Sequence, residues 1–200
     1  MSWSIEDGPG TGALNVALGK AQAAGILMFC SCIDRGASAA DNTYPGKSNC
    51  CIKIGAATAS GEKLPWVSGD KSEFLLPGEN VQPAEADAWS HSQSGPFGSS
   101  IATALAAGLA GVLLYCNRLI GCETTASTQD AGEVEELRDT GNMRNAFKSM
   151  APRDNFVEVR NSLEPLFKNP QDIVWNKKKA GSGKVMKDLE LFMAGRKGLR

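Results

Sequence analysis

The sequence predicts an α/β fold with a mostly parallel sheet, and three observations support this. Residues Ala13 to Ala24 show the apolar spacing of an amphipathic helix, and the continuous apolar run Ile26–Cys30 follows at once. Two more apolar runs, Cys51–Ala57 and Phe74–Leu76, precede a long Ala/Gly-rich helix, Ile101–Tyr115. A strand that is apolar at successive positions is buried on both faces, as in parallel sheets with helical crossovers.

Turn residues mark where these elements begin and end. Gly25 follows the first helix, as a glycine at a helix C-terminus typically does. Pro77-Gly78 ends the third strand, and Gly98-Ser99-Ser100 leads into the long helix. We therefore expect strands that alternate with helices over residues 1–117.

The pattern weakens beyond Asn117. Three segments there have intermittent helical spacing: Glu133–Met150, Phe156–Phe167 and Val185–Ala194. We therefore expect a division into residues 1–117, a partial α/β domain, and residues 118–200, a poorly defined helical and linker tail.

The distribution of charge supports two segments of different character. Residues 1–130 carry seven Lys or Arg and twelve Asp or Glu, whereas residues 131–200 carry fourteen and ten. The net charge of −1 does not favour nucleic acid as a partner. The uncharged run Ile101–Cys116 is shorter than the ~20 residues of a membrane-spanning helix, so we expect a buried helix and no membrane partner.

Six cysteines raise the question of disulfides or metal ligands: Cys30, Cys32, Cys50, Cys51, Cys116 and Cys122. No Cys-x-x-Cys pair occurs, and the sequence has a single histidine, His91, so the spacing does not indicate a zinc site. We expect free, mostly buried thiols, which favour an intracellular, reducing compartment. No cofactor is predicted.

The serine at the start of the long helix has two interpretations from the sequence alone. Ser100 would cap the helix, which is the commonest role of serine there. It would also suit a nucleophile, because the amide groups and dipole at a helix N-terminus stabilise a developing oxyanion.

The order of motifs over roughly 117 residues resembles the C-terminal half of the peptidase domain of subtilisin-like serine proteases, the subtilases. That family places its nucleophile in Gly-Thr-Ser-Met-Ala, and Gly98–Ala102 matches this motif. The upstream landmarks follow in the family's order: Met1–Ser4, Ser31–Asp34, Tyr44-Pro45-Gly46, Ile54-Gly55-Ala56 and Leu76-Pro77-Gly78. The tail and the Cys-rich strand look most like the subtilase domains of intracellular fungal proteins.

This resemblance implies a three-layer sandwich and a serine endopeptidase that cleaves peptide bonds by acyl transfer. Ser100 would attack the scissile carbonyl, and its backbone N–H would be one oxyanion-hole donor. The side chain of Asp34 would take the second donor position, where the family usually has Asn. Substrate would bind between two segments, Ser2-Trp3-Ser4 and Ser31-Cys32-Ile33.

Two departures from the family bear on activity. An ionised carboxylate at Asp34 has no proton to donate to an oxyanion. The family's catalytic Asp and His precede its Met-Ser-Leu-Gly segment, which corresponds to Met1–Ser4 here, and His91 does not match the family's base. We expect either an enzyme whose upstream half is missing from this sequence, or a non-catalytic remnant that binds peptides.

Overall fold

The structure is a computed structural model that describes Met1 and residues 5–36, 43–68, 72–81, 97–124 and 137–159. Its centre is a parallel three-stranded sheet in the order β2-β4-β5, formed by Met28–Ser31, Cys51–Ala57 and Phe74–Pro77. A smaller antiparallel pair joins β1, Ile5–Glu6, to β3, Thr43–Tyr44. The predicted α/β class and parallel sheet are confirmed.

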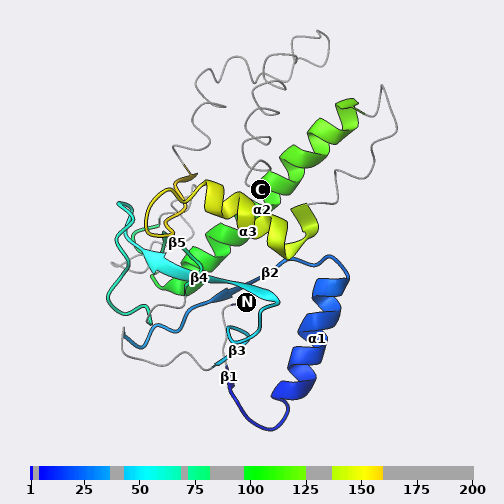
Figure 1. The fold of residues 1–200 in the computed structure, drawn as a ribbon. Coiled ribbons are helices and arrows are strands. Elements are labelled where there is room, and N and C mark those ends of the chain that lie inside the picture. The colour runs from blue at the N-terminus through cyan, green and yellow to red at the C-terminus, as the bar shows by residue number, and fades with distance from the viewer. Residues whose placement is uncertain (2–4, 37–42, 69–71, 82–96, 125–136, 160–200) are drawn as a thin grey trace, which may run out of the picture.

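Helices cover both faces of the central sheet (Figure 1). Helix α1, Thr11–Ala23, lies on one side, and α2, Ser99–Thr124, and α3, Thr140–Ser149, lie on the other. Alternation along the strands explains the two faces, because Cys30 and Cys51 pack with Leu18 of α1 while Ile52 and Ile54 pack with α2 and α3.

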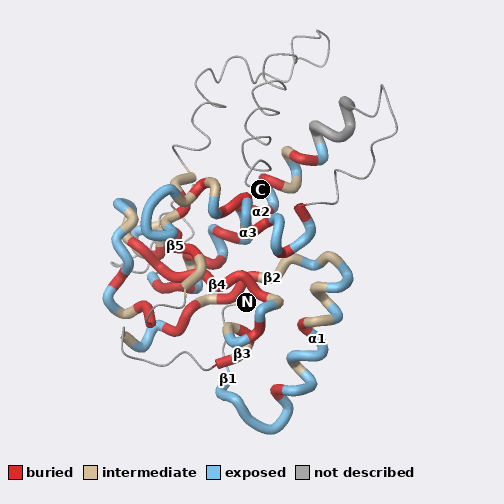
Figure 2. The backbone as a smooth tube through the Cα atoms, in the orientation of Figure 1, coloured by how far each residue is buried: buried red, intermediate tan, exposed pale blue. Residues whose placement is uncertain are grey.

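Strand β4 is buried at every position, which is the pattern expected of the central strand in a covered parallel sheet. Its observed bounds are those that the sequence predicts. Helix α1 ends where Gly25 adopts a φ of +70° and its N–H donates to the Gln22 carbonyl at 2.9 Å. Figure 2 shows that the sheet is mostly buried and that much of α1 is exposed.

Helix α2 is longer than the sequence predicts. It begins at Ser99 and continues to Thr124, and its Ala102, Ala106, Leu109 and Leu113 are buried in the main core. By length and composition, Ser99–Arg118 would also be able to cross a membrane. The outward side of α2 is apolar as well, with Leu105, Val112 and Tyr115 exposed.

Residues beyond Asn117 contribute to the same core, which differs from the division that the sequence suggests. Leu137, Met143, Phe147, Met150 and Val157 are all buried in the cluster that contains the strands. Phe147 is the largest fully buried side chain, and its ring centroid lies 5.8 Å from that of Phe29 and 5.4 Å from that of Phe74. Residues 137–159 and the sheet therefore form one folded unit.

Two sets of side-chain contacts explain where α3 begins and how it is held against the sheet. The Asp139 carboxylate accepts a hydrogen bond from the Asn142 N–H at 3.0 Å, so α3 begins at Thr140 rather than at Glu133. Arg144 pairs with Glu73 through Nε–Oε2 at 2.5 Å and donates to the Cys51 carbonyl at 2.9 Å. This guanidinium thus joins α3 to the start of β4 and to the residue before β5.

The segment after α3 first pairs with the sheet, so the predicted helix Phe156–Phe167 does not begin at Phe156; among the described residues, helical structure starts at Val159. The Leu75 N–H donates to the Asn155 carbonyl at 2.8 Å, and the Val157 N–H donates to the Leu75 carbonyl at 2.9 Å. Backbone partners on the outer edge of β5 therefore decide the conformation of residues 155–157. Residues 160–167 and the third predicted helix, Val185–Ala194, lie outside the described residues.

Candidate active site

The N-terminus of α2 lies at the carboxyl edge of the parallel sheet, where it contacts residues from the ends of all three strands. Asp34 follows β2, Ala56 is near the end of β4, and Gly78 follows β5. The Gly98 N–H donates to the Gly78 carbonyl at 2.7 Å. Ligand sites in open α/β sheets form at this edge.

The exposed Asp34 and the buried Ser99 form a polar cluster at the start of the helix. The Ser99 N–H donates to Asp34 Oδ2 at 2.8 Å, and the Ser99 hydroxyl donates to Asp34 Oδ1 at 2.7 Å. The same hydroxyl oxygen accepts from the Ala56 N–H at 3.1 Å. Ser99 therefore links β2, β4 and α2 through three hydrogen bonds.

Ser100, the next residue of the helix, is exposed. Gly98, just before the helix, has a φ of +124°. A Cβ placed on Gly98 would lie 3.0 Å from Asp34 Oδ2 and 3.7 Å from Ser100 Oγ. The two residues that the sequence singled out therefore have side-chain oxygens close to the same glycine, and Ser100 is exposed.

The role of Asp34 in this arrangement is that of an acceptor. Both of its carboxylate oxygens receive hydrogen bonds from Ser99, which satisfies the first free N–H of α2. Asp34 held in this way caps the helix with both of its oxygens as acceptors. The N–H groups of Ile101 and Ala102 donate to the Gly98 carbonyl, so the Ser100 N–H is the donor at the helix start that these bonds leave for a negatively charged oxygen.

The structure describes only one of the two predicted substrate-binding segments. Ser2, Trp3 and Ser4 lie outside the described residues, as does His91. Ser31 is half-buried, whereas Cys32 and Ile33 are buried. The Cys32 N–H donates to the Ile54 carbonyl at 2.8 Å, and the Ile33 carbonyl accepts from the Ser68 N–H at 2.9 Å. Of these three residues, Ser31 has the most accessible side chain.

Sequence reasoning missed the part played by Ser99. The motif Gly98-Ser99-Ser100 offers two adjacent serines, and the family resemblance directs attention only to the second. The Ser99 hydroxyl has a structural role because the end of β2 places an acceptor, Asp34, beside it and β4 places a donor, the Ala56 N–H, beside it. No local sequence signal contains that information.

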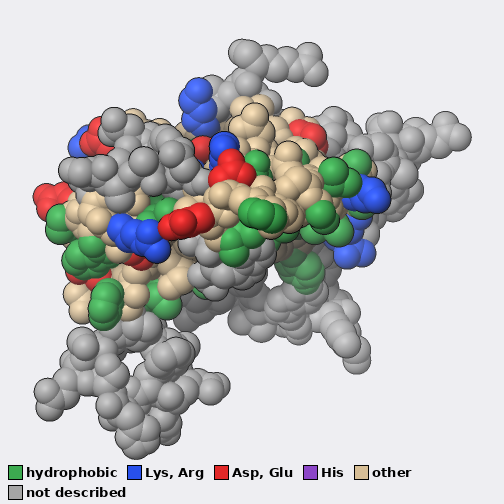
Figure 3. Space-filling model, turned by 90° about the horizontal axis from the view of Figure 1, so that it is seen from below, with side chains coloured by type: hydrophobic (Ala, Val, Ile, Leu, Met, Phe, Trp, Pro, Cys, Tyr) green, Lys and Arg blue, Asp and Glu red, His purple; other side chains and the backbone are tan. Residues whose placement is uncertain are grey.

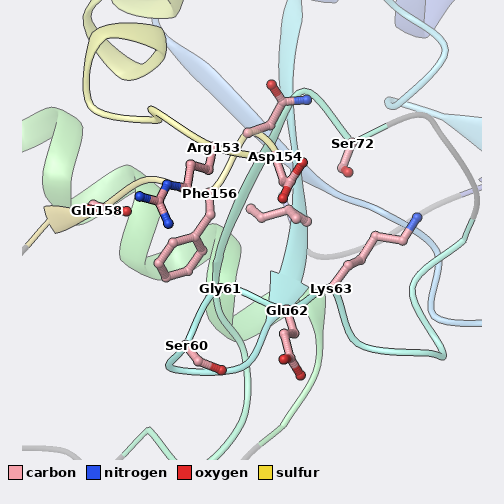
Figure 4. Close-up of a pocket in the computed structure, with 11 residues that line it drawn as sticks. Ser60, Gly61, Glu62, Lys63, Ser72, Arg153, Asp154, Phe156 and Glu158 are labelled. Atoms are coloured by element: carbon pink, nitrogen blue, oxygen red, sulfur yellow. The ribbon is translucent and has the colours of Figure 1, made fainter.

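A separate cavity of about 850 Å³ lies on another part of the surface, between the loop at Ser60–Lys63 and the turn at Arg153–Phe156 (Figure 4). The Phe156 ring packs on Gly61, where a Cβ would lie 2.8 Å from the ring. Acidic and basic side chains both line the cavity, and neither Asp34 nor Ser100 does. Mixed charge also marks the face in Figure 3, where Lys and Arg side chains lie next to Asp and Glu.

The fold and the placement of this site define an α/β domain with the fold of subtilisin-like proteases. Three solved structures of that kind are similar to the chain. The patellamide maturation protease PatA has a TM-score of 0.56 and 18% identity, and the match covers 96% of this chain and 61% of that chain. A point mutant of the PatA protease domain has a TM-score of 0.56 and 19% identity, with 84% of this chain and 57% of that chain covered. The prenylagaramide maturation protease PagA has a TM-score of 0.53 and 18% identity, with 74% of this chain and 49% of that chain covered. No family model and no curated protein matches the sequence.

The chain spans about half to three fifths of the length of these structures. At identities of 18–19% the similarity shows the fold.

One prediction concerns the helix cap. We expect Asp34→Ala to lower the free energy of unfolding by about 2–3 kcal/mol, because the buried Ser99 hydroxyl and N–H both lose their acceptor. Asp34→Asn keeps one acceptor oxygen and is expected to cost less than half as much. Urea titration followed by circular dichroism measures both variants. An equal loss of unfolding free energy for the Ala and Asn variants would contradict a helix cap in which both carboxylate oxygens of Asp34 accept hydrogen bonds from Ser99.

Proposed function

We propose that this chain contains the part of a subtilisin-like serine endopeptidase active site that supplies the nucleophile. Ser100 would be that nucleophile, and a peptide would be the substrate. The observation that carries the proposal is the exposed Ser100 at the N-terminus of α2, at the carboxyl edge of the sheet. The protease fold of the similar structures supports it.

In the proposed reaction, the Ser100 hydroxyl attacks the scissile carbonyl, and the Ser100 N–H at the start of α2 stabilises the oxyanion. A serine alcohol needs a base to remove its proton. The only histidine of the sequence, His91, lies outside the described residues and does not match the family's base. We therefore propose that the base of an active enzyme comes from a part of the family's peptidase domain that this chain does not contain.

The matching prediction is that the 200-residue chain does not react with a fluorophosphonate probe and does not hydrolyse peptides. Loss of the serine or histidine of a subtilisin triad lowers turnover by ~10⁶-fold. Labelling is measured by mass spectrometry, with Ser100→Ala as the control. Labelling that Ser100→Ala abolishes would contradict the missing base and support a nucleophile that is activated within this chain.

A non-catalytic, peptide-binding remnant is the second candidate. The engagement of Asp34 as a helix cap favours it, because the side chain in the oxyanion-hole position is already occupied by Ser99. The coding sequence just upstream distinguishes the two candidates. An Asp-Ser/Thr-Gly strand end and a His-Gly-Thr helix start there would support the enzyme, and the absence of both would support the remnant. Free thiols are consistent with either candidate in a reducing, intracellular compartment.

A further inference from the structure

Two cysteines lie together under α1, on the face of the sheet opposite α2. Cys30 of β2 and Cys51 of β4 are buried and pack with Leu18 in a small cluster separate from the main core. The strand register pairs Met28 with Cys51 and Cys30 with Lys53, so the two cysteines are diagonal neighbours whose side chains share one face. Both are free thiols, and nothing in the candidate active site uses them.

We propose that Cys30 and Cys51 form a reversible redox pair, a disulfide site that a hydroperoxide closes and a dithiol reductant opens, with α1 as its cover. The proposal rests on the register, burial and packing of the two thiols and does not depend on the function of Ser100. Among the described residues no group of three metal-ligating side chains surrounds them.

Charged groups around Cys51 favour its thiolate. Arg144 Nη2 donates to the Cys51 carbonyl at 2.9 Å, and the buried Lys53 shares the face of both cysteines. The one acidic group nearby, Glu73, is paired with Arg144 at 2.5 Å. Reactive cysteines are found in such electropositive surroundings.

The two thiols have different reactivity for a physical reason. A hydrogen bond with the Cys30 thiol lowers the pKa of Cys51, against the effect of burial, and Arg144 lowers it further. The same hydrogen bond and burial raise the pKa of Cys30. Cys51 is therefore the attacking sulfur and Cys30 the resolving one.

The chemistry balances with one equivalent of hydrogen peroxide. The Cys51 thiolate attacks one peroxide oxygen, the O–O bond breaks, and the departing hydroxide takes up a proton to leave as water. The sulfenic acid so formed is attacked by the Cys30 sulfur, which loses its proton, and a second water leaves as the S–S bond forms. Two thiols and one peroxide give one disulfide and two waters.

Geometry makes this disulfide labile. Diagonal neighbours on adjacent parallel strands lie roughly 8 Å apart between Cα atoms, from ~4.8 Å across the strands and ~6.6 Å along them, which is beyond the ~4.4–6.8 Å of most disulfides. Closing the bond therefore requires β2 and β4 to slide by a small amount. Strained disulfides have more oxidising potentials and are readily reduced, which suits a reversible response rather than a structural crosslink.

Access to the buried pair comes through α1. Only Thr11 and Leu18 of this helix are buried, and Figure 2 shows most of α1 as exposed or intermediate. A segment with so few buried contacts opens locally at low free energy. Transient release of α1 would then expose both sulfurs to a small oxidant.

The test is peptide mapping of the full chain after treatment with hydrogen peroxide and alkylation of the remaining thiols. Trypsin releases Ala21–Arg35, which holds Cys30 and Cys32, and Ser48–Lys53, which holds Cys50 and Cys51. We expect these two peptides joined, with a mass lower by two hydrogen atoms than their sum, and separated again by dithiothreitol. Absence of the joined species would overturn the proposal.

Matched variants assign the bond within each peptide. Cys30→Ser and Cys51→Ser are expected to abolish the joined peptides, whereas Cys32→Ser and Cys50→Ser keep them. The opposite pattern would overturn the assignment. Leu18→Ala is expected to accelerate disulfide formation at least several-fold, and Val16→Ala, at a position that is 59% exposed on the same helix, is expected to leave the rate unchanged. Equal rates for these two variants would overturn the role of α1 as the cover.

Discussion

Phe147→Ala is expected to lower the free energy of unfolding by about 3–5 kcal/mol, the usual cost of removing a buried phenylalanine side chain. The ring is fully buried in α3 and packs on Phe29 of β2 and Phe74 of β5. Its removal leaves a cavity between the helix and two strands of the sheet. Urea unfolding measured by circular dichroism gives the difference.

The control is Phe97→Ala, whose ring is 66% exposed and contacts Trp66 edge-on at 6.1 Å between centroids. We expect it to cost under about 1 kcal/mol, because most of the ring stays in water. A cost at Phe147 as small as that at Phe97 would show that residues 137–159 are not part of the core.

Gly78→Ala is expected to be comparably damaging, with a loss of at least about 3 kcal/mol, at the upper end of what added atoms cost in a packed interior. A Cβ on Gly78 would lie 2.3 Å from Ala56 Cβ and 3.0 Å from the Gly98 carbonyl oxygen. These contacts are with backbone and Cβ atoms, which no rotamer change relieves. The new methyl group would push the start of α2 away from the end of β4.

Gly108→Ala is the matched control for this second substitution. Gly108 lies in the middle of α2, and nothing would lie within 4 Å of its Cβ. Alanine favours helix over glycine by about 0.5–1 kcal/mol, so this variant is expected to be more stable than the wild type. If Gly78→Ala were equally well tolerated, the close approach of α2 to β4 would be contradicted.

The positions of the main elements could be predicted from the sequence because their signals are local. Continuous apolar runs fixed β4 and located β2 and β5, and the spacing of apolar residues located α1. Gly25 gave the end of α1 because its positive φ is a property of glycine itself. The ordered landmarks from Leu76-Pro77-Gly78 to Gly98-Ser99-Ser100 likewise indicated the protease-like fold.

The long-range contacts were beyond the sequence. The apolar Phe156 and Val157 would suit a helix, but here they follow a turn at Asn155 with a φ of +59° and lie beside β5 because Leu75 offers backbone hydrogen-bond partners. The sequence placed Met143 and Phe147 on the apolar face of a helix, but it did not show that Phe147 packs against Phe29 of β2 and Phe74 of β5. Both results depend on what lies opposite in space, which a local pattern does not record.

The sequence by itself determined the α/β class, the central strand and the choice of Ser100 and Asp34 as candidate site residues. These depend on apolar spacing and on the order of motifs, which are properties of the linear sequence. Only the tertiary structure decided that Asp34 caps α2 through Ser99, that Ser100 is exposed, and that Cys30 and Cys51 share a cover. The physical reason is that burial and hydrogen-bond partners are set by distances between strands and helices far apart in the sequence.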